Sequence, residues 1–439
     1  MILLLLICAD EWKLDVVHRK GGLDRVEGLI LERTAEQVRI RCVRRRPGKP
    51  TVFWTDVVPA AEIRRVEELS PEERKKLEAR LETLKKEREH LHGLEQAIGK
   101  GTAPPADMVD LSDEDWPEEP RKRAMAYASS HFKLWCAGRP ELAQLAAIYL
   151  EQVYAAYARI LPPREKGEPT TILLMPMADY RAMLKARKLD LLAPAFYDPD
   201  RNRVVCGSDL SRLMDERDKV RDHHKKLRGE IRERRAELMK AYKGKPPASL
   251  LSPLRDAEKR IDVSEGRNAD VVARGRQRLF ARLYHESFHA YLGTCVYPGK
   301  GNAVPVWLNE GLAQVFESAI VEAGEMRIGH ADPAKVAAVR ELAKKKELPS
   351  LADLLRSTAK DFQAAHASAK READKHYLAS WALAHWLAFD RRLLGTAKLD
   401  AYVAALGRDA DPASAFRDLV GEPLPKAEEA WLAWLAKLR

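Results

Sequence analysis

Apolar and polar positions alternate through the first part of the chain. The alternation has a period of two, which is typical of half-buried strands. Glycine and proline pairs separate the segments as turns. We therefore expect a small all-β, SH3-like barrel over residues 10–66, with a binding or docking role. Its strands are predicted at 13–18, 25–32, 37–44 and 51–57.

A helical period replaces this alternation after residue 67. Ser70, Pro71 and Glu73 form a helix-capping signal. Apolar residues then recur every seven positions, but charged residues interrupt the partner row. This pattern predicts a solvated spacer helix, with a short coiled coil as the alternative. An acidic stretch with proline and glycine follows, so we expect residues 67–120 to comprise the charged helix and a linker.

Strand and helix patterns alternate from residue 121 onwards, which predicts an α+β domain with a mixed sheet over residues 121–330. A charged segment and its return predict a helical hairpin inserted at about 208–270. His223 and His224 lie on it, where solvated side chains are expected rather than a second metal site. Residues 331–439 are predicted to form a helical C-terminal subdomain. Within 121–330, strands are expected at 131–136 and 170–175, helices at 140–161 and 177–188, and a β-hairpin at 195–206.

Composition and charge narrow the function classes. The chain has 439 residues, 46% of them hydrophobic, and a net charge of +10. This length predicts two or three domains. The basic residues are interleaved with acidic ones and no nucleic-acid motif is present, so we expect no specific nucleic-acid partner. No segment after the N-terminus is long and apolar enough to predict a transmembrane helix.

The N-terminal segment and the cysteines are the features of the sequence that relate to cellular location. Met1–Ala9 resembles the apolar core of a signal peptide, which predicts export to the periplasm or cell envelope. The alternative is a buried first strand in a cytoplasmic protein. The five cysteines include no Cys-x-x-Cys pair, so no zinc ribbon is indicated, and disulfide pairing stays open.

The strongest chemical signal is the pattern His-Glu-x-x-His at residues 285–289. Residues four apart share one face of a helix, so His285 and His289 can both bind one metal ion. Glu286 then lies beside that ion, where it can take a proton from a bound water. Apolar residues at helical spacing predict that this helix is largely buried: Leu279, Phe280, Leu283, Tyr284 and Phe288.

Glu310 supplies the third candidate ligand, 21 positions after His289. Catalytic zinc typically has three protein ligands, and two histidines with a glutamate form one such set. Residues 307–317 are predicted to form the helix that carries Glu310. An ordinary glutamate in the first turn of a helix is the alternative.

These segments together resemble the gluzincin group of zinc metallopeptidases. Residues 285–289 followed by Trp307-Leu308-Asn309-Glu310-Gly311 carry the resemblance, and 377–383 match a later segment of an uncharacterised bacterial gluzincin-like (peptidase MA-like) family found in planctomycetes. The resemblance covers roughly residues 125–437. It implies a zincin-like fold, a Zn²⁺ cofactor and an antiparallel edge strand for an extended substrate, expected at 203–207. Gln314 stands where gluzincins often carry an acidic residue that orients a zinc histidine; Glu317 is a weaker substitute.

We therefore expect a zinc-dependent peptidase with His285, His289 and Glu310 as metal ligands and Glu286 as general base. Tyr377 is a candidate donor to the oxyanion, with packing in an apolar helix as the alternative. His376 and His330 are weaker candidates for that role. Two other functions remain open: a non-catalytic envelope scaffold that binds proteins through the β module or the hairpin, with structural or no metal, and an amidase acting on cell-wall peptides.

Overall fold

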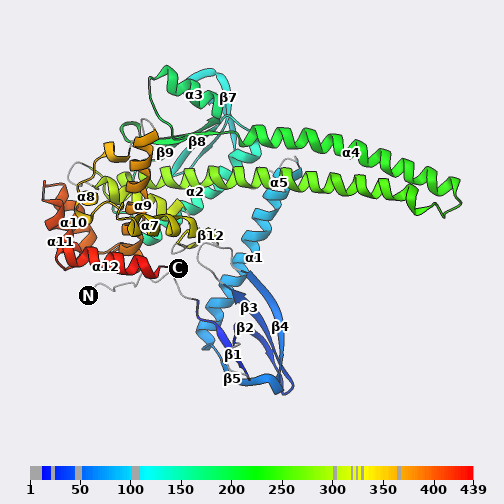
Figure 1. Ribbon diagram of the computed structural model, residues 1–439, viewed down its shortest axis with the longest axis horizontal. Coiled ribbons are helices and arrows are strands. Elements are labelled where there is room, and N and C mark those ends of the chain that lie inside the picture. Colours follow the sequence, from blue (N-terminus) through cyan, green and yellow to red (C-terminus); the bar gives the residue numbers. More distant parts are fainter. Residues whose placement is uncertain are drawn as a thin grey trace. The chain divides into compact units, whose positions relative to one another are not determined.

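A computed structural model describes residues 12–20, 25–44, 52–100, 109–299, 304–317, 320–322, 325–327, 331–362 and 367–438 (Figure 1). The candidate signal segment Met1–Ala9 lies outside these residues. The chain forms two compact units. One contains Met1–Leu91, Leu150–Glu168 and Ser287–Arg439, and the other His92–Tyr149 and Pro169–Glu286. The protein has an α+β fold with an all-β N-terminal module, a mixed sheet and a helical C-terminal part.

The N-terminal β module contains the four predicted strands and a fifth that was not predicted. Among the described residues its sheet has five strands in the order β4-β3-β2-β1-β5, and every pairing is antiparallel. Alternate side chains, such as those of Val38 and Ile40, are buried on one face. The strands are β1 (Asp15–Arg19), β2 (Arg25–Arg33), β3 (Gln37–Arg44), β4 (Val52–Pro59) and β5 (Ile63–Glu67), with a 3₁₀ turn η1 (Ala60–Glu62) before β5.

Helix α1 (Pro71–Lys100) packs on this sheet, so the prediction of a solvated spacer is wrong for its first turns. Leu77, Leu81 and Leu84 are buried in one cluster with Trp12 and Leu29. An apolar stripe on a helix needs an apolar surface to pack against, and the face of the β module that carries Leu29 supplies it. The predicted cap is present, since Ser70 Oγ accepts a hydrogen bond from Glu73 N at 3.3 Å.

The second sheet is mixed and, in the described part of the chain, has the order β10-β11-β9-β8-β7-β6. Strands β8, β9 and β11 are parallel to one another, and β10, β7 and β6 run antiparallel to their neighbours. Its strands are β6 (Ser112–Trp116), β7 (Glu119–Ala128), β8 (Phe132–Cys136), β9 (Thr170–Pro176), β10 (Ala195–Asp198) and β11 (Arg203–Ser208). Helix α3 (Met177–Ala186) packs on it through Tyr180 and Leu184, and the 3₁₀ turn η2 (Pro199–Arg201) joins β10 to β11.

The acidic run expected in a linker instead forms strand β6. Its acidic side chains are exposed and pair with the next strand, because Arg123 on β7 binds both Asp113 at 3.1 Å and Asp115 at 2.7 Å. Trp116, the last residue of β6, is buried. This strand is held in the sheet by ion pairs to its neighbour. It therefore lacks the alternation of apolar residues by which strands are usually predicted.

The predicted helical hairpin is present as α4 (Leu210–Ala241) and α5 (Ala248–Tyr291), which lie side by side in Figure 1. Ion pairs join the two arms: Arg228 binds Asp262 at 2.7 Å and Glu265 at 3.0 Å, and Arg235 binds Glu258 at 2.7 Å. The apolar seam between them includes the buried residues Ile231, Ile261 and Val272.

His224 corrects one expectation about the hairpin. It is buried rather than solvated, and its Nδ1 lies 3.2 Å from Oε1 of Glu265 on the opposite arm. His223, its neighbour, is exposed as expected. Helix geometry explains the difference, because residues one apart point about 100° away from each other.

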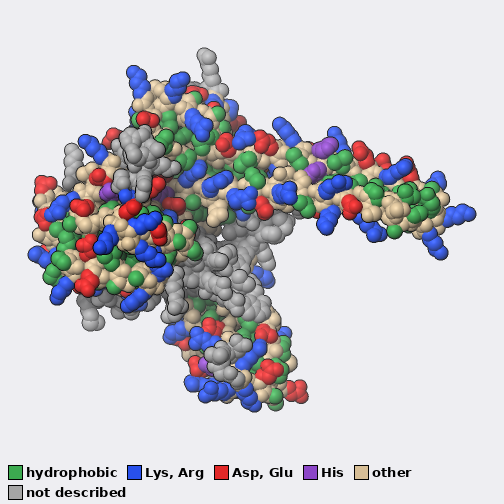
Figure 2. Space-filling view, viewed as in Figure 1, with side chains coloured by type: hydrophobic (Ala, Val, Ile, Leu, Met, Phe, Trp, Pro, Cys, Tyr) green, Lys and Arg blue, Asp and Glu red, His purple; other side chains and the backbone are tan. Residues whose placement is uncertain are grey.

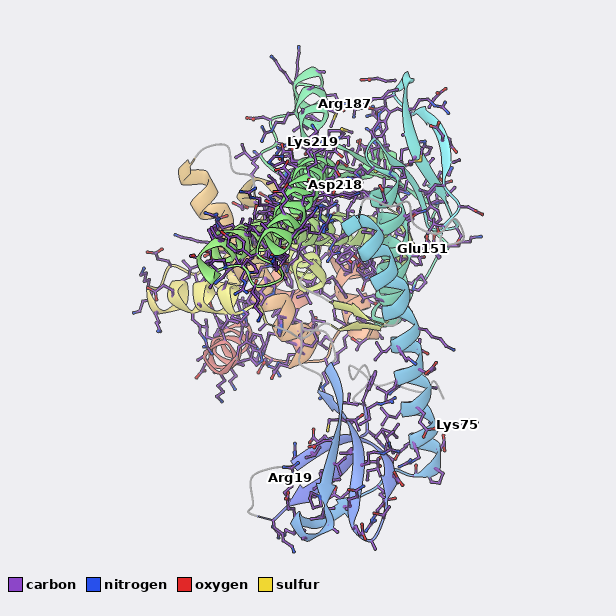
Figure 3. The ribbon with its side chains drawn as sticks, turned by 90° about the vertical axis from the view of Figure 1, so that its right-hand side faces the viewer. Arg19, Lys75, Glu151, Arg187, Asp218 and Lys219 are labelled. Carbon is purple, nitrogen blue, oxygen red and sulfur yellow. The ribbon has the colours of Figure 1, made fainter. Side chains whose placement is uncertain are left out.

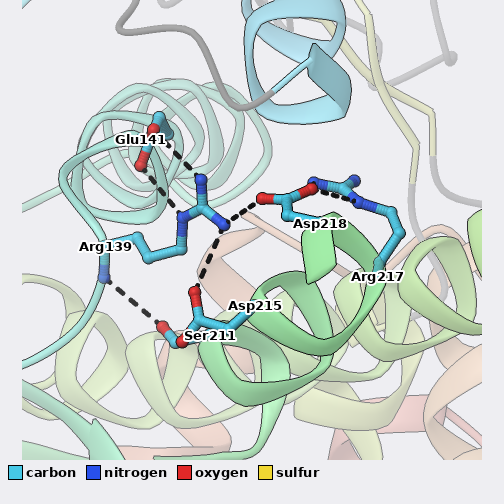
Figure 4. Close-up of polar contacts among 6 residues, drawn as sticks. All are labelled: Arg139, Glu141, Ser211, Asp215, Arg217 and Asp218. Carbon is cyan, nitrogen blue, oxygen red and sulfur yellow. Dashed lines mark hydrogen bonds and ion pairs between the residues drawn. The ribbon is translucent and has the colours of Figure 1, made fainter. Parts of the chain in front are cut away.

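A network of ion pairs fixes the root of the hairpin to the start of α2 (Pro140–Ile160) (Figure 4). Nη1 of Arg139 lies 2.6 Å from Asp218 and 3.4 Å from Asp215, both on α4. Its Nε lies 3.4 Å from Glu141, and Arg217 holds Asp218 from the other side at 2.7 Å. Desolvation alone would raise the pKa of Asp218, but the hydrogen bonds from Arg139 and Arg217 lower it overall.

The C-terminal part is helical, as predicted. Buried tryptophans dominate its core, including Trp307, Trp381, Trp386 and Trp431. Two short strands, β12 (Ile320–Glu322) and β13 (Glu325–Arg327), were not predicted. The remaining elements are α6 (Val306–Glu317), α7 (Pro333–Lys344), α8 (Leu351–Leu355), η4 (Ala359–Phe362), α9 (Ala367–Phe389), α10 (Ala397–Leu406), α11 (Pro412–Val420) and α12 (Leu424–Lys437).

The described residues contain neither a membrane-spanning helix nor a disulfide bond. Among the helices that the structure describes, none is long and apolar enough to cross a membrane. Four of the five cysteines lie in the described residues, and all four are buried and unbridged: Cys42, Cys136, Cys206 and Cys295.

Candidate metal centre

Helix α5 carries the His-Glu-x-x-His pattern near its C-terminal end. The predicted buried face is confirmed, since Leu283 and Phe288 are fully buried and Leu279 is nearly so. Phe288 also stacks on Phe316 of α6, with ring centroids 4.5 Å apart. After Tyr291 the helix continues as a single π-helical turn, η3 (Leu292–Val296). Packing therefore fixes the rotation of α5 about its axis, and with it the direction of the histidines.

Helix α6 carries Glu310 and begins at Val306, one residue before the predicted start at Trp307. Its opening turn is fixed by the backbone bond from Leu308 N to Pro305 O at 3.0 Å, and Trp307, Leu308 and Leu312 are buried. This leaves Asn309 and Glu310 on the less buried face of the first turn. The apolar residues thus anchor the helix while the two polar ones face the histidines.

The three predicted ligands come together. His285, His289 and Glu310 each offer a ligand atom, and these atoms all lie within 4.8 Å of one another. Nε2 of His289 is 3.6 Å from Oε1 of Glu310, which is too long for a hydrogen bond. The side chains of His289 and Glu310 are only 9% and 17% exposed. Two electron-pair donors that face each other in a largely buried site have the arrangement of metal ligands.

Asn309 is a site residue that sequence reasoning missed. Nδ1 of His289 donates a hydrogen bond to Oδ1 of Asn309 at 2.8 Å. This bond places the ring proton on Nδ1 and leaves the lone pair of Nε2 directed at Glu310. Ligand histidines usually have such a partner for their second nitrogen. The only sequence signal was its position directly before Glu310.

Gln314 has a different role from the one that the resemblance suggested. Its Nε2 donates to the backbone carbonyl of Tyr377 at 2.9 Å, and its Oε1 accepts from Lys335 at 3.4 Å. Glu317 also lies near Lys335, with the two charged groups 4.0 Å apart. These two contacts join α6 to α9 and α7, and Gln314 Nε2 also lies 3.4 Å from the backbone carbonyl oxygen of Glu310, one turn earlier. None of the three contacts involves His285 or His289.

Close packing of α6 on α9 explains the glycine after Glu310. A Cβ atom added to Gly311 would lie 2.3 Å from the carbonyl oxygen of Ser380 and 2.8 Å from Cβ of Ala384. No real Cβ atom approaches a backbone oxygen so closely, so a larger residue would push the two helices apart. Gly311 thus holds Glu310 at its observed position relative to α9.

Tyr377 lies on α9, and two of its contacts are defined. Its backbone carbonyl accepts from Gln314, and its ring meets the edge of Phe362 at a centroid distance of 5.1 Å. Neither contact involves the hydroxyl. His376 also contacts Phe362, at 5.8 Å, while His330 lies outside the described residues. The catalytic role of Tyr377 stays a prediction.

Glu286 lies close enough to the mixed sheet to influence groups on α3 and β11. Burial raises the pKa of the Cys206 thiol to about 12, with a smaller opposing effect of Arg282 and a smaller raising effect of the Glu286 carboxylate. The pKa of Tyr180 is raised by burial first and then by Cys206 and Glu286. The candidate general base is therefore near β11 and the residues that pack on it.

The edge strand differs from the expectation. Residues 203–207 belong to β11, which lies between β10 and β9 and is buried. The edge strand on this side of the sheet is β10, paired antiparallel to β11 in register Ala195–Cys206 to Asp198–Arg203, and β6 forms the opposite edge. Its outer backbone groups are the ones that an added strand could pair with.

Comparison with known protein families gives one match. The sequence profile of a family described as "protein of unknown function (DUF1570)" matches residues 280–402. This segment includes the three candidate ligands, Asn309, Glu286 and Tyr377. No curated protein and no solved structure matches the chain.

Proposed function

We propose that the protein is a zinc-dependent hydrolase of the gluzincin type that acts on peptides. The observation that carries the proposal is the convergence of His285, His289 and Glu310 within 4.8 Å, with Glu286 on the same helix as the two histidines. Two histidines and a glutamate form a known ligand set of catalytic zinc.

The ligand spacing supports zinc on geometric grounds. A tetrahedral zinc ion with bonds of about 2.1 Å separates two of its ligand atoms by about 3.4 Å. The 3.6 Å between His289 Nε2 and Glu310 Oε1 is close to that separation. The tautomer fixed by Asn309 supports it further, since it leaves Nε2 unprotonated and able to bind.

Each residue has a defined task in this proposal. Zn²⁺ held by the three ligands would polarise the scissile carbonyl and lower the pKa of a bound water toward about 7. Glu286 accepts the proton of the attacking water and later passes it to the leaving amine. Asn309 keeps the His289 ring in its binding tautomer. Tyr377 is proposed to donate to the oxyanion that forms as the carbonyl is attacked.

The edge strand β10 suggests how the substrate is held. An extended peptide that pairs with the outer backbone groups of β10 is bound through its main chain, largely without regard to its sequence. An added strand cannot pair with β11, because both backbone edges of β11 are already paired, one with β10 and one with β9. This supports a peptide as the substrate class.

A digestion experiment tests the proposal. The purified full chain, supplied with zinc, is incubated with a mixed peptide library, and the products are identified by mass spectrometry. We expect cleavage that a chelator abolishes, and a loss of about 10²- to 10⁴-fold in Glu286→Gln, which keeps the size of the side chain but cannot act as a base. If zinc is bound but neither the parent nor Glu286→Gln cleaves anything, the scaffold alternative is favoured. Undiminished turnover in Glu286→Gln would contradict its role as the base.

A further inference from the structure

The turn of the α4–α5 hairpin has a charge pattern unlike that of its two arms. The arms carry both acidic and basic residues, with the basic ones in excess. Residues 238–254 contain Lys240, Lys243 and Lys245 but no Asp or Glu. We call residues 238–254 the hairpin tip. Its apolar residues are Leu238, Met239, Ala241, Tyr242, Pro246, Pro247, Ala248, Leu250, Leu251, Pro253 and Leu254.

Several of these apolar side chains are unusually exposed. Met239 is 42% exposed, Tyr242 45% and Leu250 39%. Figure 2 shows hydrophobic side chains gathered at this end of the hairpin, with basic side chains around them. Large apolar residues that cluster on a surface, rather than occurring singly, mark interaction sites.

The tip is a defined turn that presents these side chains outward. Lys243 and Gly244 have positive φ angles of 49° and 86°. Gly244 N donates to Met239 O at 2.7 Å and Lys243 N donates to Lys240 O at 3.3 Å. This is the hydrogen-bond pattern that closes a helix with a left-handed residue. The backbone N–H groups of residues 242–245 all donate to carbonyl oxygens within the tip, which lowers the cost of moving this part of the turn into a less polar medium.

The arms hold the tip away from the mixed sheet. Helix α4 has 32 residues and therefore spans roughly 48 Å. Its root is fixed by Arg139, and ion pairs between the arms continue to Arg235 and Glu258. A long, braced hairpin that ends in apolar and basic side chains suits contact with a surface outside the molecule.

We propose that the hairpin tip binds the surface of an anionic lipid bilayer. Met239, Tyr242 and Leu250 enter the boundary between headgroups and acyl chains, and the three lysines contact the lipid phosphates. Tyrosine is favoured at that boundary because its ring is apolar and its hydroxyl stays hydrated. The charge complementarity favours lipid over a protein partner, since the tip offers three cations and no anion. This inference is independent of the proposed zinc chemistry.

Co-sedimentation with vesicles tests the proposal. The full chain is mixed with vesicles of phosphatidylglycerol and phosphatidylcholine in equal parts, and with vesicles of phosphatidylcholine alone. We expect binding to the anionic vesicles that weakens as salt is added. Each lysine near such a surface contributes about 1 kcal/mol, so Lys240→Gln, Lys243→Gln and Lys245→Gln together should weaken binding about 100-fold. Met239→Ser, Tyr242→Ser and Leu250→Ser together should weaken it at least about tenfold.

A matched control separates the tip from the net charge of the chain. Lys219, Lys225 and Lys226 are exposed on the shaft of α4, and Lys219 is labelled in Figure 3. Changing these three to Gln removes the same charge and should leave binding within about threefold of the parent. Circular dichroism must show equal helix content in all variants. The proposal is overturned if the parent binds no vesicle, if phosphatidylcholine alone binds equally well, or if the shaft variant loses as much as the tip variant.

Direct insertion is measured with a dye. Tyr242→Cys labelled with an environment-sensitive fluorophore should shift to shorter wavelength on adding anionic vesicles, while the same dye at Lys225→Cys should not. Co-sedimentation without a shift at position 242 would mean that another surface binds the lipid, and would overturn the assignment to the tip.

Discussion

His289 and Asn309 are joined by a hydrogen bond of 2.8 Å between Nδ1 and Oδ1, across two helices and 20 residues of sequence. This bond orients the ring whose other nitrogen faces Glu310. It makes Asn309 a positioning residue of the candidate metal centre, although it is not itself among the three ligands.

Replacing Asn309 should weaken metal binding. Asn309→Ala removes the acceptor that holds the tautomer and ring orientation of His289, and loss of such a partner typically lowers metal affinity about 10- to 100-fold. Asn309→Asp keeps an acceptor at the same place and should retain most of the affinity. Competition with a chromogenic zinc chelator measures both. Equal affinity in the parent and Asn309→Ala would show that the bond does not serve the metal.

Replacing Gln314 should change stability and not metal affinity. Gln314→Glu removes the Nε2 donor and sets a carboxylate against the Tyr377 carbonyl. We expect a loss of about 1–3 kcal/mol in the free energy of unfolding, because a carbonyl loses its donor and a charge faces it. Denaturant unfolding and chelator competition on the same sample separate the two effects. If Gln314→Glu binds zinc more tightly than the parent, an acidic residue at this position does orient a zinc histidine, as the resemblance implies.

Tyr377→Phe tests the proposed oxyanion donor. If the phenol stabilises the transition state, kcat for peptide cleavage should fall roughly 10²-fold while KM changes little. The contact with Phe362 is kept, so the fold should be unaffected. An unchanged kcat would leave Tyr377 as a packing residue of α9.

The Arg139 network predicts an acid-dependent loss of stability. The pKa of Asp218 is lowered in the fold from its usual value of 3.8. A carboxyl with a lowered pKa stabilises the fold fully above its unfolded pKa, and this contribution is lost as the pH falls below about 4 through the folded pKa. Thermal unfolding of Asp218→Asn between neutral pH and acid should therefore show a shallower decline than the parent. Parallel curves would mean that Asp218 contributes nothing to the acid sensitivity.

The sequence predicted which residues form the His-His-Glu cluster better than it predicted their surroundings. Spacing alone brought His285 and His289 to one face of α5, and local apolar patterns predicted the helices that carry them and Glu310. The partner of His289 could not be predicted, because it depends on the angle between two helices. The resemblance to gluzincins expects an acidic residue at Gln314, whereas Gln314 bonds to a backbone atom of α9, a tertiary contact that no sequence pattern reveals.

Three parts of the fold escaped prediction for related reasons. Strand β6 is exposed except at Trp116 and is paired by charges, so it lacks apolar alternation. The leucine stripe of α1 was visible, but its partner, the face of the β module around Trp12, is a tertiary contact. The β10–β11 hairpin was predicted, but which of its two strands lies at the edge depends on the pairing of β11 with β9.

The central claim is tested most directly by the metal content of the purified full chain. Elemental analysis after reconstitution with zinc and removal of free ions compares the parent with Glu310→Ala and with the control Glu317→Ala, which alters a glutamate on the same helix that lies near Lys335. The account predicts about one zinc per chain in the parent and in Glu317→Ala, and much less in Glu310→Ala. No zinc in the parent, or as much in Glu310→Ala as in the parent, would contradict the proposed metal centre.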